Sequence, residues 1–193
     1  MHATEILMEE HEAILRFIDA LDLAAEHLAA GRPVRAGFFL DAADFIKGFA
    51  DGCHHHKEEG LLFPALEAAG MPSEGGPVGM MLHEHDVGRA YTRAMREAAE
   101  KLHAGDAAAT AGVFENAHGY AALLRQHIQK ENMVLFRMAD NFIQGAAADE
   151  LTAAFERVEK EETGEGVHEK YLAILDALER EAREAGAPVA LRA

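Results

Sequence analysis

Residues 53–66 read CHHHKEEGLLFPAL, and residues 127–139 read HIQKENMVLFRMA. Both stretches stand in segments whose apolar residues recur every three to four positions, which is typical of amphipathic helices. The chain therefore contains two copies of a His-x-x-x-Glu motif, each followed by Leu-Phe. An offset of 73 residues aligns five positions of the two copies: His54 with His127, Lys57 with Lys130, Glu58 with Glu131, Leu62 with Leu135 and Phe63 with Phe136.

A shorter repeat precedes each copy of the motif. Glu10-His11-Glu12 matches Glu84-His85-Asp86 at an offset of 74 residues. Each half of the chain thus has a lone histidine on one predicted helix and a His-x-x-x-Glu motif on the next. We interpret the two halves as two copies of one helical hairpin.

Four long helices are predicted from the apolar spacing and from the breakers between them. They cover about residues 4–29, 35–69, 80–103 and 107–143. The segment Gly31-Arg32-Pro33, the Gly- and Pro-rich stretch at 70–79 and a short turn at 103–106 separate them. Short connections between long helices favour antiparallel neighbours. The predicted fold class is therefore all-α, an up-down-up-down four-helix bundle over residues 1–145.

The remaining residues, 146–193, are predicted to form a C-terminal helical extension that packs on the bundle. Two shorter helical pieces near 149–162 and 167–185 are broken by Thr-Gly-Glu-Gly at 163–166. The final stretch, GAPVALRA, is predicted to be a frayed tail.

The composition limits the classes of partner. The chain has 193 residues, with 18 Lys and Arg against 34 Asp and Glu and a formal net charge of −16. So acidic a chain repels phosphate backbones, which argues against nucleic acid, and no apolar run reaches the roughly 18 residues of a membrane span. The N-terminal stretch lacks the pattern of a secretory signal, and Cys53 is the single cysteine. These features favour a cytoplasmic location, with Cys53 as a buried, inert thiol.

The spacing within the motif points to metal chemistry. Four residues advance an α-helix by about 400°, so His and Glu at i and i+4 share one face of the helix. An imidazole and a carboxylate directed together into a bundle core form a metal-ligand pair, and without a cation their burial would be costly. The lone histidines fit as well, because His11 and His54 lie at about equal distances from their connecting turn, as do His85 and His127.

The triple histidine allows two registers. The repeat selects His54 with Glu58, whereas His55 with Glu59 has the same spacing and competes with it. His56 is predicted to be exposed or near a rim.

Several other residues also match patterns of metal sites, but simpler roles are predicted for them. Tyr120, seven residues before His127, lies on the motif face and is interpreted as a core residue with a hydrogen-bonded hydroxyl, with participation in chemistry as the alternative. Glu165-x-x-His168 and Glu115-x-x-His118 match a ferritin-type spacing, but Glu165 lies in a Gly-broken turn and His118 faces away from the motif face, so His168 is interpreted as a lid or surface residue. Three histidines lie roughly 160–200° around their helices from the motif histidines and are predicted to be solvated or partly exposed: His27, His83 and His118.

The combined pattern resembles the hemerythrin-like, HHE cation-binding proteins over about residues 4–143. The resemblance rests on the two motifs in register, each with a partner histidine and a Leu-Phe trailer. It implies a site of two non-haem iron ions, bridged by an oxo or hydroxo group, inside the four-helix bundle. The resemblance assigns six ligands: His11 and His54 to one iron, His85 and His127 to the other, and Glu58 and Glu131 as bridging carboxylates. Nitrogen ligands with shared carboxylates suit iron better than structural zinc.

One departure from the family pattern affects the expected function. Oxygen-carrying hemerythrins have a further histidine one turn before the position of His85, and here that position is Met81. Asn132, rather than a second carboxylate, follows Glu131. One iron is therefore expected to be short of a protein ligand and open to an exogenous molecule, which favours reactivity or sensing over simple oxygen carriage.

Three functions follow from this interpretation. The first is a di-iron module that binds or senses oxygen, nitric oxide or a related small ligand, or that stores or handles iron. The second is a di-iron redox enzyme that handles peroxide or nitric oxide. The third is a bundle whose metal is structural or that acts through protein partners. The expected partners are a small diatomic ligand or peroxide, with no nucleic acid and no membrane.

Overall fold

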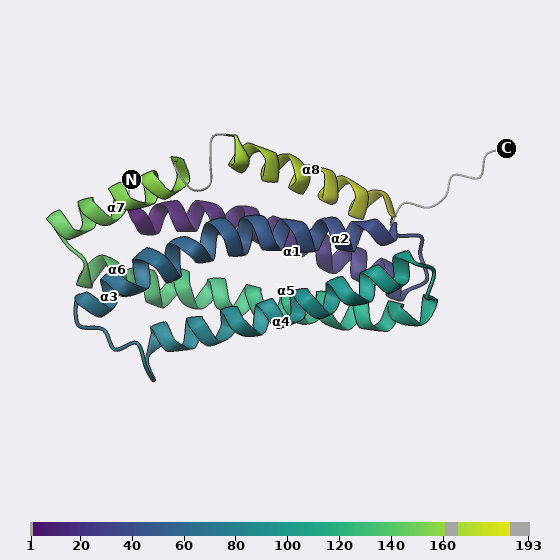
Figure 1. Cartoon of the computed structure of the whole chain (residues 1–193), viewed down its shortest axis with the longest axis horizontal. Coiled ribbons are helices and arrows are strands. Elements are labelled where there is room, and N and C mark those ends of the chain that lie inside the picture. The colour runs from purple at the N-terminus through teal and green to yellow at the C-terminus, as the bar shows by residue number, and fades with distance from the viewer. Residues whose placement is uncertain (1, 161–165, 186–193) are drawn as a thin grey trace.

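The computed structural model describes residues 2–160 and 166–185, and all its regular elements are helical (Figure 1). The first long helix is α1 (Ala3–Ala29) and the third is α4 (Pro77–His103). The second is a succession of four elements: α2 (Ala36–Phe45), η1 (Ile46–His55), η2 (Glu58–Leu62) and α3 (Phe63–Ala68). The fourth also has four: η3 (Ala107–Ala109), α5 (Thr110–Lys130), η4 (Glu131–Leu135) and α6 (Phe136–Phe142). The predicted all-α bundle is confirmed.

The first helix of each hairpin ends in the same way. Gly31 and Gly105 have positive φ angles of 72° and 97°, a conformation that favours glycine. The next backbone N–H then reaches back to the helix, from Arg32 to the His27 carbonyl and from Asp106 to the Lys101 carbonyl. These are Schellman caps, and they let the chain reverse direction within a few residues. The duplication seen in the sequence therefore extends to the turns.

Two apolar clusters make the core of the bundle. The larger includes Phe17, Phe45 and Phe49, and the smaller includes Phe63 and Phe136 of the two Leu-Phe trailers. In each of the four long helices, buried ligand-type side chains lie where residues of one cluster give way to residues of the other: Glu10 and His11, His54 to Glu58, His85, and His127 with Glu131. A buried polar layer thus crosses the bundle between two apolar regions.

The helical geometry changes at both motifs. Elements η1, η2 and η4 are π-helical, with wider turns than an α-helix, and η2 and η4 start at the motif glutamates Glu58 and Glu131. Each residue of a π-helix advances by roughly 80° rather than 100°, so successive side chains lie closer to one face. The sequence interpretation assumed α-helical angles throughout and therefore missed this feature.

The C-terminal extension consists of α7 (Ala146–Val158) and α8 (Val167–Ala185), which lie along one side of the bundle over α1 and α2 (Figure 1). Tyr171 of α8 fits against Gly48, where an added Cβ would lie 1.7 Å from the Tyr171 hydroxyl. Arg16 of α1 also pairs with Asp176 and Glu179. The two predicted helical pieces correspond to α7 and α8, whereas positions 161–162 of the first piece, the break at 163–165 and the predicted tail at 186–193 lie outside the described residues.

Candidate metal centre

Two groups of potential metal ligands lie in the buried polar layer. We name as site A the group of His11, His54, Glu58 and Glu131, and as site B the group of His55, Glu58, His85 and His127. Within each group one ligand atom per residue lies within 4.8 Å of all the others, and every member is buried. Glu58 belongs to both sites. The structure thus brings together all six residues singled out from the sequence, and it adds His55.

The two motif carboxylates lie between the sites. Glu131 Oε2 is 3.2 Å from His11 Nε2 of site A and 3.2 Å from His127 Nε2 of site B. Glu58 places Oε1 3.5 Å from His54 Nε2 and Oε2 3.4 Å from His85 Nε2. Each carboxylate therefore faces one histidine of each site, as bridging ligands do.

Each imidazole is oriented by a partner at its other nitrogen. Nδ1 lies 3.0 Å from a glutamate oxygen at both His54 and His127, 2.7 Å from one at His85 and 3.2 Å from an aspartate oxygen at His55. A carboxylate only accepts, so Nδ1 carries the proton in each of these four rings and Nε2 keeps its lone pair. The five pairs are His54 with Glu10, His55 with Asp51, His85 with Glu59, His127 with Glu84, and His11 with Asn132 Oδ1 at 2.7 Å.

The donor atoms fit bound cations. Nε2 of His11 faces Nε2 of His54 at 3.0 Å, and His85 faces His127 in the same way at 3.1 Å. Two lone pairs so close repel unless a cation or proton lies between them. Two nitrogens about 2.1 Å from one ion are about 3.0 Å apart at a right angle and about 3.4 Å apart in a tetrahedron. The observed spacing therefore fits the right-angled geometry of a six-coordinate metal.

The carboxylate oxygens lead to the same result. Both oxygens of Glu58 and both of Glu131 are buried and have no hydrogen-bond partner among the described residues. Buried polar atoms are normally paired, and an unpaired carboxylate is among the most costly groups to bury. These four oxygens are therefore available to a cation.

The pKa values show how the clustered imidazoles and carboxylates affect one another. Burial alone would lower the pKa of His85, but its contacts with Glu58 and Glu59 raise it to about 9. The pKa of His11 is also raised, because contact with Glu131 outweighs burial. Burial lowers the pKa of His54 and His55 well below the ordinary value. Protons and metal ions therefore compete for the same nitrogens.

In each half of the repeat, a lysine forms an ion pair with the outer glutamate, the one that accepts from Nδ1 of a ligand histidine. Lys57 pairs with Glu10, and Lys130 pairs with Glu84. The lysine side chains differ in exposure, at 2% for Lys57 and 40% for Lys130. The C-terminal extension accounts for this difference in exposure, because Glu159, just after α7, approaches Lys57 to 3.9 Å. The two halves of the site share one plan but differ in access to water.

Two expectations about the ligand set need correction. The sequence leaves His54 and His55 as competing ligands of one motif, whereas the structure places one of them in each site. One metal was expected to lack a ligand because Met81 replaces a histidine, but His55 supplies site B with a third imidazole and Met81 packs in the smaller apolar cluster. The signal in the sequence was Asp51, which precedes His55 by one turn and accepts from its Nδ1.

The remaining histidines lie outside the two sites. His56 and His83 are exposed, and the exposed His118 contacts Asp22. His168 is half-buried, with its ring against Phe49 and Nδ1 3.7 Å from Glu159. The prediction for His27 was wrong, because this residue is 5% exposed. That prediction assumed a broad solvent face on α1, whereas α5 and α8 both pack along this helix.

The expectations for Tyr120, Cys53 and Glu165 had mixed outcomes. Tyr120 is a core residue as predicted, but its buried hydroxyl has no hydrogen-bond partner in the described part of the chain. Cys53 is buried, and its thiol donates to the Gly48 carbonyl at 3.2 Å. Glu165, part of the ferritin-type spacing, lies outside the described residues.

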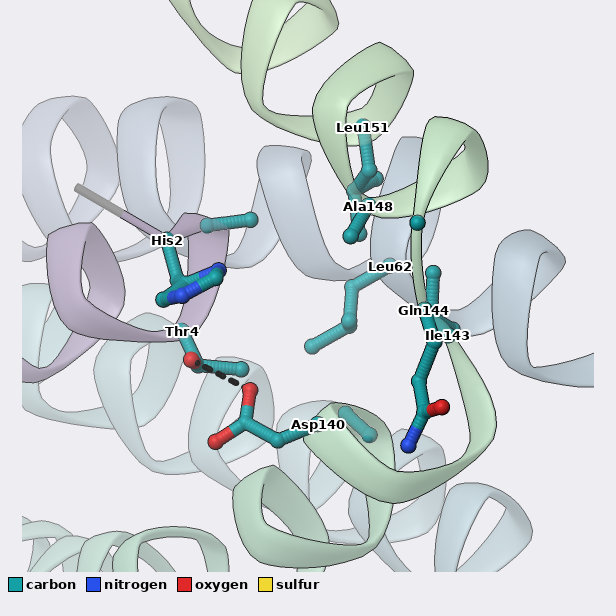
Figure 2. Close-up of a pocket in the computed structure, with 11 residues that line it drawn as sticks. His2, Thr4, Leu62, Asp140, Ile143, Gln144, Ala148 and Leu151 are labelled. Atoms are coloured by element: carbon teal, nitrogen blue, oxygen red, sulfur yellow. Dashed lines mark hydrogen bonds between the residues drawn. The ribbon is translucent and has the colours of Figure 1, made fainter.

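Two pockets differ in their relation to the sites. One of about 340 Å³ is lined by His55 of site B and by Tyr120, together with residues of α2, η1 and α4. Another of about 270 Å³ lies where the start of α1 meets α6 and α7, and Figure 2 shows Thr4 hydrogen-bonded to Asp140 across it at 2.8 Å. Only the first of these two pockets contains a candidate metal ligand.

Comparison with known proteins agrees with the geometry. Residues 2–139 match the hemerythrin HHE cation binding domain. The chain is also 25% identical over 163 residues to uncharacterized proteins of Mycobacterium bovis and Mycobacterium tuberculosis. The matches cover 84% of this chain and 63% of each relative, so the chain spans under two thirds of their length. No solved structure matched the chain. No described helix is long and apolar enough to span a bilayer.

Proposed function

The chain belongs to the hemerythrin HHE cation-binding domain family, and from that premise we propose that sites A and B hold two non-haem iron ions that bind oxygen, nitric oxide or a related small ligand. The observation that carries the proposal is the convergence of buried donors without other partners: five imidazole Nε2 atoms and the four oxygens of Glu58 and Glu131. Bound iron would supply reversible redox chemistry and positions for an exogenous ligand.

The charge of the layer supports two cations. When the ligand histidines are neutral, as metal binding requires, no described Lys or Arg pairs with Glu58 or Glu131, whereas Glu10 and Glu84 are neutralised by Lys57 and Lys130. The outer pair Asp51 and Glu59 shares the single cation Arg89. The layer therefore carries about three uncompensated negative charges, which two divalent ions would neutralise.

The choice of iron rests on the type and angle of the donors. Structural zinc sites favour tetrahedral sets rich in cysteine, and the only cysteine, Cys53, donates its thiol to a backbone carbonyl. Here the donors are imidazoles and shared carboxylates at spacings that fit a right angle. Such a set suits iron or manganese, and the family resemblance favours iron.

The two sites differ in their number of protein ligands. Site A has two imidazoles and two carboxylates, whereas site B has three imidazoles, Glu58 and Glu131 Oε2 close to His127. We propose that the exogenous ligand binds at site A, because the iron there has fewer protein donors. The open coordination position is thus proposed at site A, which contains His11, and not at the iron of His85, where Met81 replaces a histidine of the family pattern.

The test is metal analysis combined with absorption spectra under air and under reductant. We expect about two irons per chain, the stoichiometry of the family, and oxo-bridged absorption bands that shift when azide is added. His54→Ala or Glu131→Ala should lose one or both irons, whereas His83→Ala should keep both because His83 is exposed. Equal loss from all three variants, or iron-free protein after growth in ample iron, would refute the assignment.

A second candidate is a redox enzyme that consumes peroxide or nitric oxide. Tyr120 supports it, because its buried hydroxyl has no hydrogen-bond partner within residues 2–160 and 166–185 and lines the same pocket as His55. A neutral hydroxyl beside a ligand of site B is able to donate a proton to a small molecule bound at that site, so this candidate places the reaction at site B rather than at site A. Sustained peroxide consumption that falls in Tyr120→Phe would support the enzyme, whereas spectral change without turnover supports the binding module. Either activity is compatible with the cytoplasmic location that we propose.

A further inference from the structure

The pocket beside site B has a charge opposite to that of the chain. Within the described part of the chain, its charged lining residues are four cations, Lys47, Arg89, Arg93 and Arg96, and one carboxylate, Asp51. Over the whole chain, acidic residues outnumber Lys and Arg by 34 to 18. We name this pocket of about 340 Å³ the arginine pocket. So local a reversal of charge concentrates anions at the pocket.

The cations fall into two pairs with different surroundings. Arg89 is held by Asp51 and Glu59, and Arg96 is held by Asp44, so both guanidinium groups are positioned by ion pairs. Lys47 and Arg93 are exposed and make no ion pair with any residue that the structure describes. These two cations are therefore free to bind an anion, which the positioned arginines would surround.

The deeper lining is mostly apolar, and its buried polar groups are the His55 imidazole and the Tyr120 hydroxyl. Ala43, Ile46 and Gly88 are buried there, and so is Tyr120, at 1% exposure. The Tyr120 hydroxyl has no hydrogen-bond partner among the described residues. Burial raises its pKa well above the ordinary value, so it remains a neutral donor. A buried donor without a partner normally indicates a ligand or water that accepts from it.

We propose that the arginine pocket binds a small organic anion, a carboxylate or phosphate ester with a short apolar body. Its acidic group lies between Lys47, Arg93 and Arg96, and its body enters against Ala43 and Ile46 and carries one oxygen that accepts a hydrogen bond from Tyr120. A volume of about 340 Å³ is at the lower end of ordinary ligand pockets, which limits the body to about one aromatic ring.

The pocket shown in Figure 2 provides a contrast within the same molecule. It is of similar size, but among the residues that the structure describes no lysine or arginine lines it, and Asp140 is the one carboxylate in the lining. The chemistry on which anion binding depends is therefore specific to the arginine pocket.

The position of the arginine pocket extends the proposed function. His55 lines the pocket and belongs to site B, and Asp51 contacts both His55 and Arg89. An anion held there would lie beside a metal ligand, and this part of the inference rests on the proposed function. Binding of the anion does not depend on it, because the cations and Tyr120 lie outside both sites.

The test is calorimetric titration of the full chain as purified, with its metal content measured on the same sample. The probes are 4-nitrobenzoate, 4-nitrophenyl phosphate and the neutral 4-nitrobenzyl alcohol, each with an oxygen on the body that can accept from Tyr120. We expect saturable binding of at least one anion, weaker at high salt, and none of the neutral alcohol. The preferred anion shows whether a carboxylate or a phosphate is recognised. Iron-free protein that binds the anion would refute the proposed function alone, and iron-loaded protein that binds neither anion would refute this inference alone.

Single-residue variants locate the binding. Arg93→Gln should weaken the anion about tenfold through loss of a charge-assisted contact, without loss of any ion pair seen in the fold. Tyr120→Phe should weaken it several-fold and leave its salt dependence unchanged. Arg137→Gln removes one charge from the exposed face of α6 and should have no effect. An equal loss in Arg93→Gln and Arg137→Gln, or no loss in either Arg93→Gln or Tyr120→Phe, would overturn the inference.

Discussion

His54 and His55 are neighbours in the chain, but their imidazoles belong to different sites. His54 Nε2 faces His11 Nε2 at 3.0 Å in site A, whereas the His55 ring stacks on His85 in site B with centroids 3.8 Å apart. Successive residues of an α-helix diverge by about 100°, which would turn one ring away from the core. The π-helical turn of η1 narrows that angle, and Glu58, shared by the two sites, lies one turn further on.

Loss of His55 should affect one site and spare the other. In His55→Ala we expect the metal content to fall by about one ion per chain, because site B loses one of its three imidazoles while site A keeps all four donors. Metal analysis and the absorption spectrum measure this change. His56→Ala is the matched control, since that neighbour is exposed and belongs to neither site. Full metal content in His55→Ala would contradict the role of this residue.

The two outer glutamates should have equal effects on metal binding and unequal effects on stability. Glu10→Gln and Glu84→Gln each weaken the acceptor of a ligand histidine, so each should weaken metal binding by about 10–100-fold. Glu10→Gln also leaves the buried Lys57 without its nearest counter-charge, which should lower the free energy of unfolding by about 3 kcal/mol.

Glu84→Gln leaves Lys130 unpaired, but that side chain is 40% exposed and remains hydrated. The free energy of unfolding should therefore fall by less than about 1 kcal/mol. Urea denaturation of metal-free protein measures both variants under the same conditions. Equal destabilisation would show that the exposure of the lysine does not control the effect.

The melting temperature should fall with rising pH in the metal-free protein but not in the metal-loaded protein. In the metal-free protein the pKa of His85 is about 9, above the unfolded value of 6.5. Its protonated form therefore stabilises the fold fully below about pH 6.5, and this contribution is lost as the pH rises through about 9. The melting temperature of metal-free protein should fall across that window.

Metal-loaded protein should show no such fall, because its histidines are already deprotonated. The apparent metal affinity should instead rise by up to about tenfold per pH unit, since each ion displaces a proton from a ligand histidine. Thermal melts of both forms between pH 6.5 and 9, with calorimetry in two buffers, test the linkage. A metal-free protein that becomes more stable toward pH 9 would contradict it.

Docking of the C-terminal helix should depend on the absence of a side chain at Gly48. In Gly48→Ala the new methyl group would lie 1.7 Å from the Tyr171 hydroxyl, so Tyr171 and α8 must shift. Limited proteolysis should then cleave the extension faster than in the parent protein. Gly60→Ala is the control, because its nearest neighbour would be 4.0 Å away and the helix should gain about 1 kcal/mol. Equal cleavage of the two variants would exclude this docking contact.

The outer contacts illustrate what periodicity does not predict. The sequence placed Glu10 and Glu84 at equivalent positions of the repeat, but it did not show that they accept from His54 and His127 across a helix interface. It also gave no indication that Arg89 links Asp51 to Glu59. Such contacts depend on the distances between helices that are far apart in the chain, which a helical wheel does not contain.

The sequence by itself determined the bundle and the convergence of six potential ligands. Heptad-like spacing, turn residues and a duplicated hairpin place His11, His54, His85 and His127 at one level, because helices rise by a constant amount per residue. Only the tertiary structure decided that His55 joins site B and that an arginine pocket opens beside it. Both depend on local π-helical turns and on helix packing, which arise when the whole core is filled and not from any single segment.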